Sequence, residues 1–150
     1  MKEIKDIIAI SKQYGKEFKD ANDRRQLWNQ SVKGIVKSTL DEIASKIIEN
    51  EIFFASNLYV EDEDNTLSLT SGKVRIPGRK DLEDGFSIHF WLLPNGKLKV
   101  TTWGHSRTEN AESIDNIVVS DLKTVDRDLI IEIIYNGIEK AIKTSYFFLG

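Results

Sequence analysis

The residues best suited to chemistry lie in one stretch, GFSIHFWLLPNGKLKVTTWGHS over residues 85–106, which holds both histidines and two of the three tryptophans. His89 and His105 could exchange protons near neutral pH or bind a metal through an imidazole nitrogen. The chain has no cysteine, and no carboxylate lies in matching strand alternation with either histidine. We therefore predict no metal site and no catalytic residue. A hydrolase that uses His89 or His105 as its base is kept as an alternative, and the nearest carboxylates in sequence are Glu83, Asp84 and Glu109.

The tryptophans of this stretch, Trp91 and Trp103, could stack on nucleic-acid bases while Lys99 holds a phosphate. The other interpretation is that Lys99 covers Trp91 across the strands and that a loop or a second subunit covers both indoles. Exposed aromatic patches mark protein interfaces more often than nucleotide platforms. The pattern therefore favours a protein interface.

Four basic residues gather in a predicted loop, at Lys73, Arg75, Arg79 and Lys80. This loop lacks the glycine-rich pattern that holds phosphates at the start of a helix. The whole chain has a pI near 5.5, whereas a nucleic-acid-binding domain is expected to be basic. Binding of single-stranded nucleic acid or a nucleotide, by the two tryptophans and this loop, is therefore the alternative function.

The acidic run from Glu61 to Asn65 offers oxygen ligands but lacks the glycine and the distal glutamate of a calcium loop. We interpret it as a charged turn that discourages pairing at a sheet edge. No cofactor is expected.

The composition is that of a single soluble domain. A chain of 150 residues can bury a core of its own, and the absence of cysteine suits a reducing cytoplasm. The net charge of −3 is uneven, with a basic segment over residues 71–107 between acidic segments. No apolar run reaches the ~18 residues of a membrane span, and the first residues lack a signal-peptide pattern. We expect a cytoplasmic protein without membrane contact.

Two periods of apolar residues divide the chain. Helical spacing over residues 4–18 and 27–48 predicts two amphipathic helices, separated by a capping signal at residues 21–23. One bent helix through the same residues is the other interpretation. From residue 52 onward the period changes to two, which predicts strands that begin with a hairpin.

The closing helix has the most regular pattern, because its apolar stripe continues from Leu129 to Ile142. Thr124 or Asp126 would cap its N-terminus. Gly137 lies on the same stripe and predicts a point of close approach to a neighbouring element.

Pro94, Asn95 and Gly96 suit a three-residue hairpin loop in which the glycine adopts a left-handed conformation. This loop places Leu93 opposite Lys97 and fixes the pairing of the two strands. One sheet face, which we expect helices to cover, carries Leu67, Leu69, Ile88, Phe90, Leu92, Leu98, Val100, Thr102, Ile117 and Val119. The opposite face carries Tyr59, Thr66, Ser68, Thr70, Ser87, His89, Trp91, Lys99, Thr101, Trp103 and Asn116.

The predicted fold is a single α+β domain over residues 1–150. It has two N-terminal helices (1–50), an antiparallel four- to five-stranded meander sheet (51–120) and one C-terminal helix (121–150), with the helices packed on one sheet face. The predicted function is a non-enzymatic binding module for a protein partner or a second copy of itself, which would form a homodimer. The predicted binding residues are Tyr59, His89, Trp91, Lys99, Thr101, Trp103, Lys73, Arg75, Arg79 and Lys80.

Overall fold

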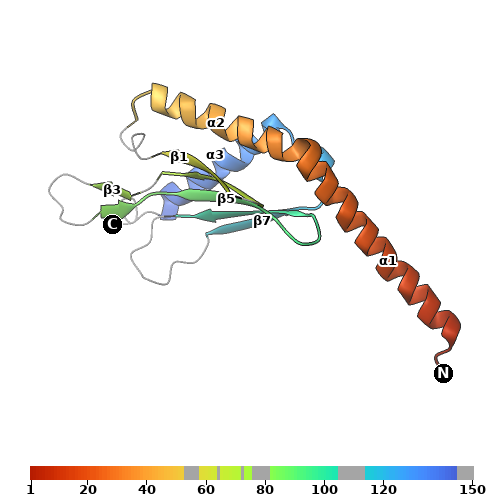
Figure 1. Ribbon diagram of the computed structural model, residues 1–150. Coiled ribbons are helices and arrows are strands. Elements are labelled where there is room, and N and C mark those ends of the chain that lie inside the picture. The colour runs from red at the N-terminus through yellow and green to blue at the C-terminus, as the bar shows by residue number, and fades with distance from the viewer. Residues whose placement is uncertain (53–57, 64, 72, 76–81, 105–113, 145–150) are drawn as a thin grey trace.

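The computed structural model describes residues 1–52, 58–63, 65–71, 73–75, 82–104 and 114–144 (Figure 1). The helices are α1 (Ile4–Leu27), α2 (Lys33–Glu49) and α3 (Arg127–Thr144), with a π-helical turn (Trp28–Val32) and a short 3-10 turn (Leu122–Thr124). The strands are β1 (Tyr59–Glu63), β2 (Thr66–Thr70), β3 (Lys73–Arg75), β4 (Leu82–Asp84), β5 (Ser87–Leu92), β6 (Leu98–Trp103) and β7 (Asp115–Val119). The α+β class is confirmed.

Residues 4–49 form one bent helix, so the prediction of two helices separated at residues 21–23 was wrong. α1 and α2 are joined through the π-helical turn, where the Lys33 N–H donates to the Trp28 carbonyl. π turns commonly coincide with bends, and Figure 1 shows the bend between α1 and α2. A capping signal contributes only about 1 kcal/mol, which is too little to end a helix whose next turns pack on the protein.

The five-stranded sheet is antiparallel throughout and has the order β1-β2-β5-β6-β7, which confirms the meander. β3 and β4 form a separate two-stranded sheet between β2 and β5 in the chain. The residues between Ser71 and Gly85 were predicted to be a loop, and this prediction missed the short hairpin. Strands of three residues are too short for their alternation to be recognised in the sequence.

The first strand ends later than predicted. β1 covers Tyr59–Glu63, so most of the acidic run predicted as a turn belongs to a strand that pairs with β2. The alternation before it falls on residues 53–57, which lie outside the described residues.

The pairing of β5 with β6 is confirmed residue by residue, from Ser87 with Trp103 to Leu92 with Leu98. The loop has the predicted geometry, since Gly96 has φ of 80° and its N–H donates to the Leu93 carbonyl. Because alternate residues of a strand point to opposite faces, this register assigns every side chain of the two strands to a face.

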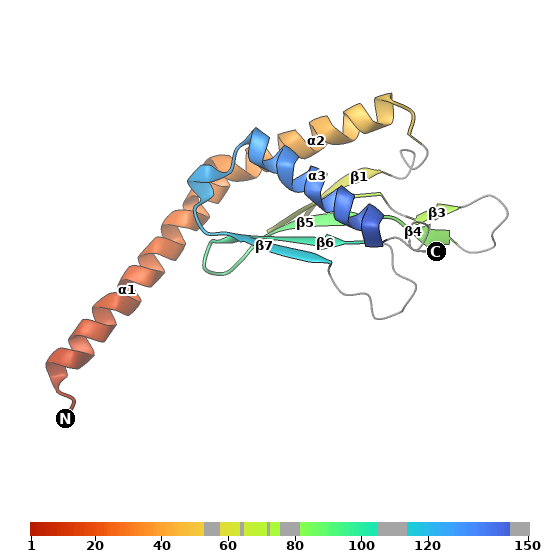
Figure 2. The same cartoon turned by 180° about the vertical axis from the view of Figure 1, so that it is seen from behind.

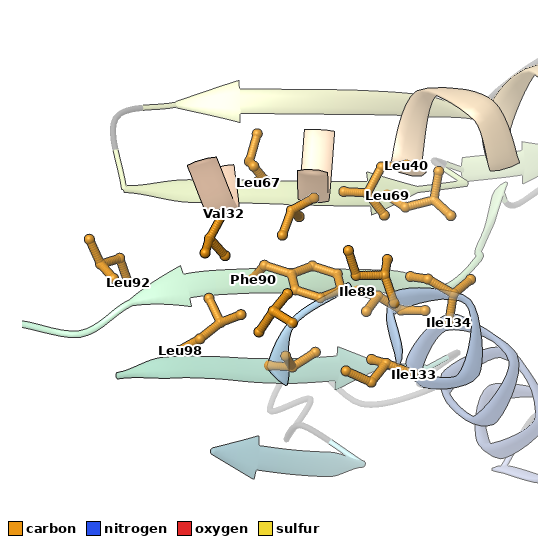
Figure 3. Close-up of a cluster of buried hydrophobic side chains, with 14 of the residues drawn as sticks. Val32, Leu40, Leu67, Leu69, Ile88, Phe90, Leu92, Leu98, Ile133 and Ile134 are labelled. Atoms are coloured by element: carbon orange, nitrogen blue, oxygen red, sulfur yellow. The ribbon is translucent and has the colours of Figure 1, made fainter. Parts of the chain in front are cut away.

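α2 and α3 lie on the same side of the five-stranded sheet (Figures 1 and 2). The core fills the space between them and the sheet, where side chains of both helices meet those of the central strands (Figure 3). The Asp126 carboxylate accepts the Leu129 N–H at 2.8 Å and caps α3, as predicted. Gly137 faces the sheet, because a Cβ atom there would lie 2.8 Å from Ile88 Cδ1.

α1 departs from the prediction most clearly. Its apolar stripe was expected to pack on the sheet, yet α1 has no buried residue. Figures 1 and 2 show it running away from the rest of the protein, with the N-terminus at its far end. The stripes of α2 and α3 also end in exposed residues, Ile48 and Ile142, because each stripe extends beyond the surface that its helix contacts.

The base of α1 is fixed by the tip of the β5–β6 hairpin. Arg24 Nε donates to the Asn95 carbonyl at 2.9 Å, and an Arg25 guanidinium nitrogen donates to the Leu93 carbonyl at 3.1 Å. Gly96 packs so closely that a Cβ atom there would lie 2.8 Å from the Ala21 carbonyl oxygen. These contacts set the direction in which α1 leaves the protein.

Candidate functional site

The sheet surface that faces away from α2 and α3 is called the open face below. Strand register and alternation place on it Tyr59, Glu61, Glu63, Thr66, Ser68, Thr70, Ser87, His89, Trp91, Lys99, Thr101, Trp103, Asn116 and Val118. No described helix covers this face. The assignment of residues to the two faces was predicted correctly, although the prediction left out Glu61, Glu63 and Val118.

A depression of about 120 Å³ lies on the open face, between β1, β2 and β5. Its lining consists of Glu61, Glu63, Thr66, Ser68, His89 and Trp91. The two carboxylates reach it because β1 extends through Glu63 and pairs Glu61 with Ser68 and Glu63 with Thr66. The signal in the sequence that would have placed them on this face was the turn-forming pair Asp64-Asn65 directly before Thr66.

His89 is half-buried at the centre of the open face. Its Nε2 shares a hydrogen bond of 2.6 Å with Ser87 Oγ, and that hydroxyl shares a second one of 2.9 Å with Thr70 Oγ1. Burial lowers the pKa of His89 from its ordinary value, because a charged imidazolium loses hydration there. The ring is therefore neutral at neutral pH.

Trp91 is the aromatic anchor of the depression. Its indole N–H donates to Thr101 Oγ1 at 2.8 Å, and its ring stacks on that of His89, with centroids 5.6 Å apart and planes at 28°. Although held on two sides, the residue is 40% exposed. One part of the indole is thus rigidly positioned and accessible to a partner.

Ser68 belongs to the lining of the depression, opposite Glu61 on the neighbouring strand, and is only 1% exposed. Its hydroxyl has no hydrogen-bond partner among the described residues. A buried hydroxyl without a partner costs about 1–3 kcal/mol. Ser68 therefore adds an unused polar group to the lining of the depression.

The other predicted binding residues are only partly brought together. Thr101 supports Trp91, and Lys99 pairs with Trp91 across the strands. Tyr59 and Trp103 lie on the same face, one cross-strand row from His89 and two rows from Trp91. Lys73 and Arg75 belong to β3, in the separate two-stranded sheet. Arg79 and Lys80 lie outside the described residues.

The geometry around His89 offers little to a hydrolase. Ser87 and His89 are within hydrogen-bond distance, but a serine nucleophile also needs a group that orients the base. In the described part of the chain, no carboxylate bonds the His89 ring, and burial is the cause of its lowered pKa. Glu83 and Asp84 belong to β4 in the separate sheet. His105 and Glu109 lie outside the described residues.

The described residues contain no group of three side chains that could hold a metal ion. Among the helices in the described ranges, none is both long enough and apolar enough to cross a bilayer. Comparisons with protein-family models, with curated proteins and with solved structures each found no match.

Proposed function

We propose that this protein is a non-enzymatic cytoplasmic binding module whose open face docks a protein partner at the depression beside Trp91. The observation that carries the proposal is the state of Trp91, which is held by Thr101 and His89 yet 40% exposed. A large aromatic side chain already fixed in place loses little conformational freedom on binding. Such residues are typical anchors of protein interfaces.

The lining of the depression indicates the chemistry of the partner. Glu61 and Glu63 bring negative charge beside the indole, and the neutral His89 does not offset it. A lysine or arginine side chain suits this combination, because a cation is attracted both to carboxylates and to the face of an indole. Arginine fits best, since its planar guanidinium can stack on the indole while its N–H groups donate to the carboxylates and to the Ser68 hydroxyl.

The same lining disfavours nucleic acid at Trp91. A base stacked on this indole would bring phosphates toward Glu61 and Glu63, and like charges repel. Lys99 lies on the other side of Trp91 and could attract a phosphate there. The binding test therefore includes an oligonucleotide.

The test is a nuclear magnetic resonance titration of the protein with N-acetyl-arginine amide. The expected result is a saturating shift of the Trp91 indole N–H signal. The shift should be at least threefold smaller with N-acetyl-citrulline amide, which has the same shape but no charge. The double variant Glu61→Gln/Glu63→Gln should lose the response. Asp128→Asn should keep it, because Asp128 is 92% exposed on α3 and far from the depression in the fold.

Two results would contradict the proposal. One is an equal response to the charged and the neutral amide, which would show that the depression does not select a cation. The other is salt-dependent quenching of tryptophan emission by a single-stranded oligonucleotide with no response to the arginine amide. That second result would instead support the nucleic-acid alternative.

A further inference from the structure

The clearest unpartnered surface of the protein is the apolar side of α1. Its large apolar residues Ile4, Ile7, Ile8, Ile10, Tyr14 and Phe18 are each more than half exposed. Such a row of exposed isoleucine and aromatic side chains is unusual on a helix in water and marks an interaction surface.

The spacing of these residues is that of a helix that pairs with another helix. Ile4, Ile7, Ser11, Tyr14 and Phe18 recur at alternating intervals of three and four, which form the seam of a coiled coil. Tyr14 and Phe18 contact each other, with ring centroids 4.6 Å apart. The charged residues of this part of α1 lie mainly on its other sides, at Lys5, Asp6, Lys12, Lys16, Glu17, Lys19 and Asp20.

α1 cannot cover this stripe with its own sheet while its base stays in place. The base is tied to the β5–β6 hairpin through Arg24 and Arg25 and through the close contact at Gly96. From there the helix continues away from the protein without a break (Figures 1 and 2). Among the described residues outside α1, none covers the stripe, which leaves it open to a second molecule.

We propose that two copies of this chain pair through α1, in antiparallel orientation. Antiparallel pairing about a two-fold axis sets Ile7 against Phe18 of the second copy, Ser11 against its Tyr14, and Ile8 against its Gly15. At the centre of the pair, small residues thus lie opposite larger ones, since Ser11 meets Tyr14 and Gly15 meets Ile8, while Ile7 and Phe18 pack together on either side. A Cβ atom at Gly15 would meet nothing within 4 Å, so the single chain leaves this space open.

The area within reach is enough for a stable pair. The α1 helix has 24 residues and is therefore about 36 Å long. Six exposed side chains on each copy, with roughly 100 Å² apiece, could bury about 1,200 Å² in total, which is the lower end of the range for specific, stable interfaces. The helix dipoles oppose each other in this orientation, which is also favourable.

The antiparallel arrangement has closed two-fold symmetry, since the same surface of each copy is used. It places the two sheet domains at opposite ends of the helix pair, and the stripe shares no residue with the open face. A parallel pair would instead bring the two hairpins that hold the bases of α1 to the same end of the helix pair. The inference is therefore independent of the proposed function of the open face.

Light scattering tests the inference directly. The native chain should have twice the mass of one 17.2 kDa chain at concentrations on the order of 10 µM. Phe18→Glu should halve that mass. Gln13→Glu lies on the same helix but off the stripe and should leave the mass unchanged. Circular dichroism should show equal helix content in both variants. A native monomer, or a Phe18→Glu variant that stays dimeric, would overturn the proposal.

Cross-linking tests the orientation, because the chain contains no cysteine of its own. An equal mixture of the Ser11→Cys and Tyr14→Cys variants should form a disulfide-linked dimer on mild oxidation, at least tenfold faster than Gln13→Cys alone. If Ser11→Cys alone cross-linked rapidly and the mixture cross-linked no faster than that, the helices would be parallel. That result would overturn the proposal. A dimer that Trp91→Glu dissociates and Phe18→Glu does not would assign self-association to the open face instead.

Discussion

His89 has catalytic potential, yet the contacts of its side chain are structural. Its imidazole bonds Ser87, stacks on Trp91 and is half-buried in the sheet. Each of these contacts is satisfied by a neutral ring. The histidine thus holds the exposed indole in position without adding a positive charge beside Glu61 and Glu63.

The lowered pKa of His89 gives stability a defined pH dependence. The unfolded chain takes up a proton near the ordinary pKa of 6.5, before the folded chain does. The contribution of neutral His89 to the free energy of unfolding should therefore be fully present above pH 6.5. It should decrease as the pH falls toward the lowered pKa of the folded state. Urea denaturation at about pH 7.5 and about pH 5.5 measures this loss.

The matched variant is His89→Gln, which keeps a polar side chain but cannot titrate. It should lose less stability than the native chain between the two pH values. Other groups with shifted pKa, such as Glu42 and Glu139, are carboxylates and titrate below this window. An equal loss in the native chain and the variant would show that His89 is not the group responsible.

At the scale of elements, the contact between α3 and the sheet depends on the absence of a side chain at Gly137. A Cβ atom there would lie 2.8 Å from Ile88 Cδ1 and 3.1 Å from Thr102 Oγ1. A larger residue would have to push α3 away from β5 and β6. This close approach allows Ile130, Ile133 and Ile134 to be buried against the strands.

We expect Gly137→Leu to lower the free energy of unfolding by about 1–3 kcal/mol, the usual cost of overpacking, despite the better helix propensity of leucine. Gly34→Leu in α2 is the matched control, because a Cβ atom at Gly34 meets nothing within 4 Å. That variant should keep or slightly raise the unfolding midpoint in urea. If Gly137→Leu raised it as well, α3 would not approach the sheet at this residue.

At the scale of the whole molecule, the protein consists of a sheet domain with its own core and a projecting helix, α1, which has no buried residue and contacts that core only at its last residue, Leu27. Every buried hydrophobic residue lies in the chain from Trp28 onward, as far as the structure describes it. The two parts therefore have separate tasks. The sheet domain supplies folding stability and the open face, and α1 supplies the pairing surface.

Removal of residues 1–20 tests this division. The shortened chain keeps Arg24 and Arg25, which contact the hairpin. When both chains are dilute, its free energy of unfolding should be within about 1 kcal/mol of that of the native chain, because no buried residue is lost. At higher concentration the native midpoint should rise, since dimerisation stabilises the folded state by mass action, while that of the shortened chain should not. If removal of residues 1–20 unfolded the chain, the sheet domain would depend on α1 for its stability, and the two parts would not have separate tasks.

The sequence by itself determined the local features of this protein. The three-residue loop at Pro94–Gly96 and the alternation on either side of it define the β5–β6 register and the two faces of the sheet. Asp126 and Gly137 were recognised because a cap and a close approach need particular residue types at particular helical positions. Each of these features depends on residues close together in the chain or on a period that backbone geometry imposes.

Only the tertiary structure decided what each surface contacts. An apolar stripe shows that one side of a helix tends to be covered but not what covers it. α1 and α2 therefore have similar apolar patterns, although α2 has buried residues and α1 has none. The depression likewise joins Glu61 and Glu63 to His89 and Trp91 through three strands. Such a site depends on pairing between distant segments, and the free energy that sets this pairing belongs to the whole core rather than to any one segment.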